Sequence, residues 1–201
     1  MYVIGLTGGV GSGKTEAAHM LAQIADAPIL LADELGHLAM EPGTEGYQQI
    51  IAAFGKTVVG EDGSILRNRL AQIVFQDEQK LQQLNDIVHP VVKKYLKEYI
   101  EERKNQDGYI ILESAIMFET GCDAFCDEVW YIYVPADVRK ARLGESRGYS
   151  EDKSEQIIRQ QLSEDEFRKR CSRTVSNAGS LEMLRKELQQ TFTLVQNDKA
   201  L

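Results

Sequence analysis

The sequence has few cysteines, no long hydrophobic run and no excess of positive charge. Its three cysteines, Cys122, Cys126 and Cys171, form no C-x-x-C pair, and their odd number argues against a disulfide framework. No apolar run approaches the roughly 18 residues that a membrane-spanning helix needs. The formal net charge of −8 disfavours general binding to nucleic acid. We therefore expect neither a disulfide scaffold, nor a membrane protein, nor a nucleic-acid-binding protein.

The N-terminus has no basic region followed by a hydrophobic segment, so no secretory signal is expected. Together with the cysteine count, this favours a reduced, cytoplasmic setting. Hydrophobic residues make up 43% of the 201 positions and charged residues 27%, as in ordinary soluble proteins. Such a chain can bury one good core and carry an inserted subdomain. Nothing in the sequence indicates an obligate protein partner.

The most informative segment is Gly8–Thr15, Gly-Gly-Val-Gly-Ser-Gly-Lys-Thr, which matches the pattern G-x-x-x-x-G-K-[ST]. An apolar run at Tyr2–Leu6 predicts a strand before it, and Glu16–Ala22 predicts a helix after it. In that context the glycines allow backbone N–H groups to surround a phosphate. We therefore disfavour the alternative interpretation, a glycine-rich turn that binds nothing. Lys14 is then placed to reach the β- and γ-phosphates, and the Thr15 hydroxyl to hold Mg²⁺. We expect a nucleoside triphosphate site.

The rest of the chain alternates between apolar strands and amphipathic helices. Three further strands are predicted, at Pro28–Ala32, Tyr109–Leu112 and Val129–Val134. The last helix is predicted over Ser180–Gln196, where apolar residues recur every three or four positions. Apolar strands separated by helices indicate an α/β protein with a parallel sheet that is covered on both faces, here a three-layer P-loop NTPase fold.

About 75 mostly helical residues separate the second and third predicted strands. We interpret them as a helical substrate-binding insertion, at about 36–107, and expect Pro90 to break or kink its longest helical pattern at His89-Pro90. A basic segment from Arg139 to Arg173, with ten Lys/Arg against seven Asp/Glu, suggests a short helical lid over the phosphates, at about 137–172. The core of this single domain would then comprise 1–35, 108–136 and 173–201.

The carboxyl ends of the predicted strands bring Asp33 and Glu113 to the same crevice as the phosphate loop. Among phosphate-loop proteins, a guanine-specific switch would carry the motif Asn-Lys-x-Asp, which is missing here, and a motor or helicase would be larger. A small kinase is the class that remains. Asp33 is the best base for a hydroxyl acceptor, although an N-cap for the following helix is an equally good local interpretation. Glu113 and Ser114 either contribute to a Mg²⁺ shell or simply end a strand.

Two lid arginines, Arg142 and Arg147, are the best clamp for the transferred phosphoryl group. The alternative interpretation is that these arginines form surface ion pairs with Glu145 or Glu151.

The opening segment Ile4–Lys14 resembles the phosphate loop of dephospho-coenzyme A kinases. Further matches follow in the order of that family, and together they extend over essentially the whole chain. They are Ala32-Asp33, Pro42-Gly43, Phe54-Gly55, Asp62-Gly63, Arg67, Leu70, Val74-Phe75, His89-Pro90, Phe118-Glu119 and Asn177-x-Gly179.

The resemblance implies ATP-dependent phosphorylation of the ribose 3′-hydroxyl of dephospho-coenzyme A, with ATP and Mg²⁺ bound. It implies that Asp33 deprotonates the hydroxyl, that Lys14 and Arg142 stabilise phosphate charge, and that Arg67 and His89 hold the acceptor. For His89, a capping or packing role beside Pro90 has equal weight. The nucleotide-binding residues implied by the resemblance are Gly11, Ser12, Gly13, Lys14, Thr15, Glu16 and Asn177, with Thr15 on the metal.

The sequence departs from the family pattern in three places. Leu31 replaces a first acid before Asp33, the separation of Arg142 and Arg147 is one residue longer than usual, and Cys171–Arg173 replaces an Ala-Asp pair before Asn177.

Two alternatives stay open. Arg67, Arg69 and Arg103 would serve another small-molecule or nucleoside monophosphate kinase, which must grip the phosphate of its acceptor. A nucleotide-dependent regulator without an acceptor would have no use for Asp33.

Overall fold

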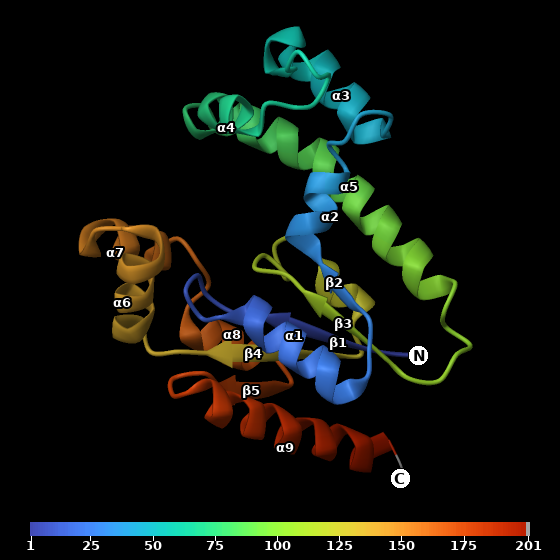
Figure 1. Ribbon diagram of the computed structural model, residues 1–201, viewed down its shortest axis with the longest axis vertical. Helices are drawn as coiled ribbons and strands as arrows, with labels where there is room; N and C mark the ends of the chain where they lie inside the picture. Colours follow the sequence, from blue (N-terminus) through green and yellow to red (C-terminus); the bar gives the residue numbers. More distant parts are fainter. Residues whose placement is uncertain (200–201) are drawn as a thin grey trace. The chain divides into compact units, whose positions relative to one another are not determined.

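The computed structural model describes residues 1–199, which divide into two compact units. The first unit comprises Met1–Leu31 and Asn105–Leu201, and the second Ala32–Lys104 (Figure 1). The first contains the sheet, and the second is helical. Each is described by itself below.

The first unit is built on a five-stranded parallel sheet in the order β2-β3-β1-β4-β5. The strands are β1 (Tyr2–Thr7), β2 (Ile29–Leu31), β3 (Tyr109–Glu113), β4 (Glu128–Tyr133) and β5 (Arg173–Ser176). The register places Leu6 of β1 beside Glu113 of β3 and Trp130 of β4. The phosphate-loop strand β1 is therefore central, as buried apolar strands require.

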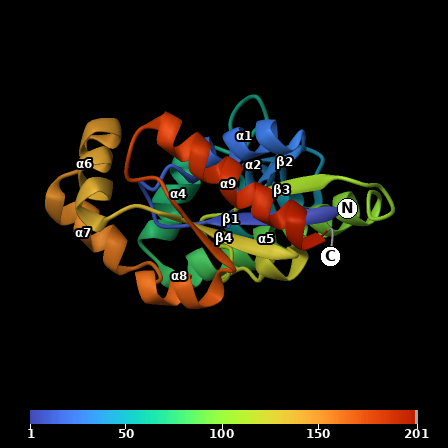
Figure 2. The ribbon, with the colours of Figure 1, turned by 90° about the horizontal axis from the view of Figure 1, so that it is seen from below.

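Five helices and a 3-10 turn complete this unit. They are α1 (Lys14–Ala25), η2 (Cys122–Phe125), α6 (Ala136–Arg147), α7 (Glu151–Arg159), α8 (Glu164–Arg170) and α9 (Leu181–Lys199). Helices α1 and α9 cover one face of the sheet, where Trp130 and Ile132 join their core cluster, and α8 lies on the other (Figure 2). On that face, the ring of Tyr131 stacks on the ring of Phe167 in α8, with 4.8 Å between the ring centroids. The predicted α/β fold with a parallel sheet is confirmed.

The second unit is helical. It contains α2 (Ala32–Leu38), α3 (Glu45–Phe54), η1 (Lys56–Val58), α4 (Arg67–Phe75) and α5 (Glu78–Glu101). Its core joins Ile50, Val58, Ile65, Leu70 and Val74. Thr44 and Asp77 cap α3 and α5 with side-chain oxygens, which satisfies N–H groups that have no partner inside the helix.

The structure differs from the sequence-based predictions in two places. A break or kink was expected at His89-Pro90, and helix α5 continues through Pro90 without a break. Proline leaves the carbonyl of Asp86 without its helical partner, and both residues are exposed, so water can take that place. Strand β5 was not predicted, because only Val175 of its four residues is buried and apolar.

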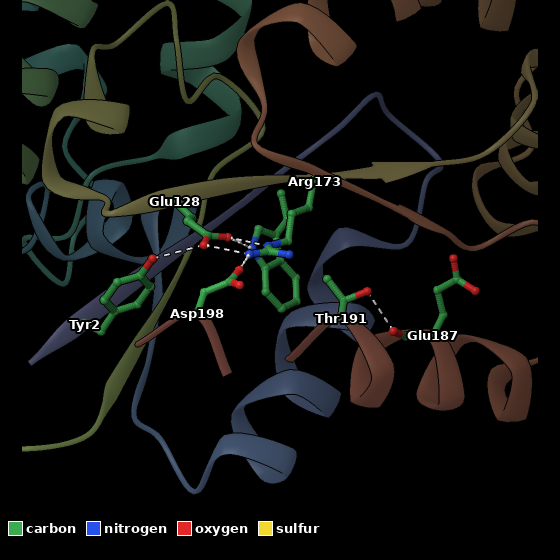
Figure 3. Close-up of polar contacts among 7 residues, drawn as sticks. Tyr2, Glu128, Arg173, Glu187, Thr191 and Asp198 are labelled. Atoms are coloured by element: carbon green, nitrogen blue, oxygen red, sulfur yellow. Dashed lines mark hydrogen bonds and ion pairs between the residues drawn. The ribbon is translucent and has the colours of Figure 1, made fainter. Parts of the chain in front are cut away.

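The N-terminal ends of β1, β4 and β5 carry a charged cluster that also holds α9 (Figure 3). The guanidinium of Arg173 donates to both carboxylate oxygens of Glu128, at 2.7 and 3.1 Å, and to Asp198 at 2.7 Å. The hydroxyl of Tyr2 and the indole of Trp130 also donate to Glu128. This cluster stabilises the sheet at its N-terminal edge, while the phosphate loop leaves β1 at the carboxyl edge.

No helix within residues 1–199 is both long and apolar enough to cross a membrane.

Candidate active site

The phosphate loop joins β1 to α1 through a left-handed turn at Gly13, where φ is 74° and ψ is 31°. A Cβ at that position would lie 2.6 Å from the side-chain nitrogen of Asn177, so both the conformation and the space require glycine. The backbone N–H of Ser12 donates to the carbonyl of Gly9 at 3.1 Å, which tightens the turn. The loop therefore has the shape that an anion-binding backbone needs.

Helix α1 presents its N-terminus to this loop. Its first residue is Lys14, whose Nζ lies 3.4 Å from the carbonyl oxygen of Gly9, and no side chain caps the helix. Thr15 and Glu16 follow in the first turn and are exposed. An uncapped first turn leaves N–H groups and the positive end of the helix dipole available to phosphate. The structure thus brings together the predicted nucleotide-binding residues of the loop.

Asn177, which follows β5, supports the phosphate loop by a hydrogen bond to its backbone. Its side-chain nitrogen donates to the carbonyl of Ser12 at 2.8 Å, and its own N–H donates to the carbonyl of Tyr133 at 2.8 Å. Asn177 is buried, with 4% of its surface exposed. Its side chain is thus engaged with the loop backbone, and its predicted contact with adenine stays a prediction.

The two predicted lid arginines occupy different environments. Arg142 of α6 donates from Nη2 to the backbone carbonyl of Asn177 at 2.9 Å, so it too supports the loop. Arg147 lies exposed in the last turn of α6. Among the residues that the structure describes, neither forms the alternative ion pair with Glu145 or Glu151, and Glu151 pairs with Lys140 at 3.1 Å.

Two residues that sequence reasoning missed lie directly on the loop. The guanidinium of Arg139 rests against Gly9, where any Cβ would overlap its Nη1, and the side-chain oxygen of Gln161 accepts from the N–H of Val10 at 2.9 Å. Arg139 lies one helical turn before Arg142, so helix spacing could have added it to the candidates. Nothing in the sequence distinguishes Gln161 from other lid residues.

Several residues with oxygen-bearing side chains lie at the carboxyl ends of β1 and β3. Glu113 is buried, and the N–H of Ser114 donates to the carbonyl of Leu6 at 3.0 Å. The hydroxyls of Ser114 and Thr7 are buried without a hydrogen-bond partner among residues 1–199. Hard oxygen atoms of this kind suit Mg²⁺ and its water shell. Residues 1–199 contain no cluster of three or more His, Cys, Asp or Glu side chains that could hold a metal by themselves.

The predicted acceptor residues belong to the helical unit. Asp33 lies exposed in the first turn of α2, which begins at Ala32, so it does not precede the helix as an N-cap would. His89 is half-buried inside α5, where burial and the nearby Lys93 lower its pKa against the opposing effect of Asp86. A helix-interior position excludes the capping alternative for His89 and leaves the packing one.

Arg67 begins α4 and lines a cavity of about 210 Å³ within the helical unit. The other lining residues are His37, Met40, Glu41, Pro42, Ser64 and Ile65. Among the residues that the structure describes, the side chains of Arg67 and His37 form no hydrogen bond or ion pair. The cavity therefore offers two unengaged nitrogen donors beside one carboxylate.

Comparison with known proteins identifies the family. The dephospho-CoA kinase family profile matches residues 2–183. The chain belongs to the dephospho-CoA kinase family. The dephospho-CoA kinase of Carboxydothermus hydrogenoformans is 36% identical over 198 residues, which cover 98% of this chain and 94% of that protein.

Solved structures agree on the fold of this dephospho-CoA kinase family member. The crystal structure of TT1252 from Thermus thermophilus has a TM-score of 0.78 and 31% identity, covering 96% of both chains. Dephospho-CoA kinase from Campylobacter jejuni has a TM-score of 0.73 and covers 98% of both chains, and its 17% identity supports the fold alone. The chain is accordingly a P-loop kinase of this family.

Proposed function

We propose that the protein transfers the γ-phosphoryl group of ATP to the ribose 3′-hydroxyl of dephospho-CoA, with CoA and ADP as products. The observation that carries the proposal is the glycine turn that leads into the uncapped N-terminus of α1, in a chain of the dephospho-CoA kinase family. Backbone N–H groups from Gly11 to Glu16 bind the phosphates in this proposal. Lys14 stabilises charge on the β- and γ-phosphate oxygens.

Asp33 is proposed as the base. It follows the carboxyl end of β2 by two residues, and β2 lies two places from the phosphate-loop strand in the sheet. As the 3′-oxygen attacks the γ-phosphorus, Asp33 accepts the hydroxyl proton, and the bond from that phosphorus to the bridging oxygen breaks to release ADP. Leu31 stands where the family pattern has its first acid, so Asp33 is the remaining acid of that two-acid pattern.

Mg²⁺ would be held by the hydroxyl of Thr15, with Glu113 and the unpartnered hydroxyls of Thr7 and Ser114 as further oxygen donors. Bound there, the ion would neutralise charge on the β- and γ-phosphates. The proposed ligands are all oxygen atoms, with no nitrogen or sulfur among them, and such a set fits Mg²⁺.

The three parts of the chain divide the work in this proposal. The core (1–35, 108–136 and 173–201) binds ATP, the lid (137–172) excludes water so that ATP is not hydrolysed, and the insertion (36–107) holds the acceptor. The lid also carries the arginine that clamps the phosphates, for which the family resemblance implies Arg142. We place the reaction in the cytoplasm.

The cavity beside Arg67 is proposed to take the diphosphate of dephospho-CoA. About 210 Å³ is smaller than the roughly 300–1,000 Å³ of a site for a whole drug-sized ligand, so it suits one part of the acceptor. The free donors of Arg67 and His37 suit an anionic part. Arg67→Gln should raise the KM for dephospho-CoA about tenfold with kcat nearly unchanged, and Arg69→Gln, on the same helix but outside the cavity, should change neither.

The test of the proposed function is ATP consumption with a panel of acceptors. Dephospho-CoA should stimulate turnover, while adenosine, shikimate, gluconate and nucleoside monophosphates should stimulate it little. Stimulation by a nucleoside monophosphate alone would replace the proposal with a nucleoside monophosphate kinase.

A further inference from the structure

Arg139 of α6 packs directly on the phosphate loop. Its Nη1 occupies the space that a Cβ of Gly9 would need, and its backbone carbonyl lies 3.1 Å from where a Cβ of Gly11 would be. Both the guanidinium and the backbone of α6 therefore pack on glycines of the loop. An arginine held this close could bind a phosphate without a large movement of the lid.

Arg139 is also a half-buried cation without a counter-charge in the described part of the chain. Its Nε is buried without a hydrogen-bond partner, and its guanidinium forms no ion pair with the residues that the structure describes. Burial lowers the pKa of Arg139, against weaker opposing effects of Tyr131, Glu164 and Tyr133. Glu164, the one carboxylate of these, already pairs with Arg168 at 2.8 Å. A half-buried cation without a counter-charge is costly unless an anion joins it.

Gln161 marks where such an anion would sit. Its side-chain oxygen accepts from the N–H of Val10 at 2.9 Å, and it lies 3.2 Å from the position of a Cβ on Gly9, the point that the guanidinium of Arg139 also contacts. The side-chain oxygen of Gln161 thus occupies a loop N–H close to the guanidinium of Arg139. A phosphate oxygen that replaced it would accept from the same N–H and bring a full negative charge near the guanidinium.

Arg142, the arginine implied by the family resemblance, is engaged elsewhere, since it donates to the carbonyl of Asn177. We propose that Arg139, and not Arg142, is the lid arginine that binds the phosphates of ATP and stabilises the transferred phosphoryl group, and that Gln161 holds the place of a phosphate oxygen until the nucleotide binds. Arg142 acts as a positioning residue that supports the loop through Asn177. This inference rests on the proposed phosphoryl transfer from ATP.

Binding of inorganic tripolyphosphate tests the assignment without an acceptor, so it is independent of which acceptor is used. Arg139→Gln should weaken binding of tripolyphosphate and of ATP, measured by calorimetry, by about tenfold or more, as expected for a charge-assisted hydrogen bond. It should lower kcat by about 10²-fold. Arg159→Gln removes an exposed lid cation that pairs only with Glu155, and it should leave binding and turnover unchanged.

Arg142→Gln should chiefly lower the melting temperature and affect tripolyphosphate binding less than Arg139→Gln does. Wild-type binding of tripolyphosphate by Arg139→Gln, or a larger loss in Arg142→Gln, would overturn the inference. Should Arg139→Gln not fold, Arg139→Lys decides, because it keeps the charge and loses the planar fork. It should then bind tripolyphosphate with intermediate affinity and have reduced kcat, and wild-type values for both would contradict the assignment. If the wild type binds tripolyphosphate through Arg139 but phosphorylates no acceptor, the proposed function fails while the assignment of Arg139 to phosphate binding stands.

Discussion

Asn177 and Ser12 are 165 residues apart in the sequence, and the side-chain nitrogen of Asn177 donates to the carbonyl of Ser12 at 2.8 Å. This bond connects the end of β5 to the phosphate loop that follows β1. Arg142 donates in turn to the carbonyl of Asn177, so α6 is joined to the same point. The shape of the loop therefore depends on a segment near the other end of the chain.

Asn177→Ala tests this dependence. It leaves the buried carbonyl of Ser12 without its donor, which should reduce the free energy of unfolding by about 1–3 kcal/mol and weaken ATP binding. Urea denaturation and calorimetry with ATP measure the two effects. Asn197→Ala, at an exposed position of α9, is the matched control and should change neither. Unaltered ATP affinity in Asn177→Ala would show that the loop keeps its shape without this support.

Asp33→Asn separates chemistry from nucleotide binding. The amide cannot accept the hydroxyl proton, so turnover with dephospho-CoA should fall by about 10²-fold or more while ATP affinity stays nearly intact. Steady-state kinetics and ATP titration measure these quantities. Glu34→Gln, the neighbouring exposed acid, should behave as the wild type. Normal turnover in Asp33→Asn would remove this residue from the mechanism and favour a regulator without an acceptor.

The charged cluster at the N-terminal edge of the sheet predicts acid sensitivity. Burial alone would raise the pKa of Glu128, but hydrogen bonds from Arg173, Trp130 and Tyr2 outweigh it, and the net pKa lies below the ordinary 4.5. The folded state thus binds this proton less readily than the unfolded state does. The stabilising contribution of Glu128 is present above about pH 4.5 and is lost as the pH falls through its lowered folded-state pKa.

Urea midpoints measured from about pH 6 to about pH 3 check this expectation. Glu128→Gln should be less stable than the wild type at the upper end, and the difference should shrink toward the lower end. Glu182→Gln, an exposed acid of α9, should follow the wild type throughout. A Glu128→Gln deficit that is equal at all pH values would mean that its charge contributes nothing.

The packing of α9 predicts a large loss of stability on truncation of its core side chains. Leu188 is fully buried against the sheet and α1, so Leu188→Ala should lower the free energy of unfolding by about 2–5 kcal/mol. Leu194 is 54% exposed on the same helix, and Leu194→Ala should cost much less. Equal effects of the two substitutions, measured by urea denaturation, would contradict the position of α9.

The sequence predicts those parts of the molecule that local pattern determines. The strands β1, β3 and β4 are continuous apolar runs, and the phosphate loop has a spacing that few other structures require, so both were predicted. Strand β5 was missed because its pairing with β4, and not its composition, makes it a strand. Local sequence also favoured a break at Pro90, where the packing of the rest of α5 preserves the helix.

In the candidate site, too, local sequence predicts some residues and the folded chain determines the others. Lys14 and Thr15 were predicted because they are positions of the motif, whereas Arg139 and Gln161 reach the loop only because distant segments fold against it. The segment from Arg139 to Arg173 has ten basic residues, and composition gives no ground for choosing among them. Burial without a counter-charge singles out Arg139, and burial is a property of the folded chain.

The most direct test of the central claim is the position at which phosphate is added. The protein, incubated with ATP, Mg²⁺ and dephospho-CoA, should yield a product whose phosphorus NMR spectrum shows one new monoester on the ribose 3′-oxygen, in equal amount to the ADP formed. ADP released without that monoester, or phosphate transferred to another position or only to a nucleoside monophosphate, would contradict the account.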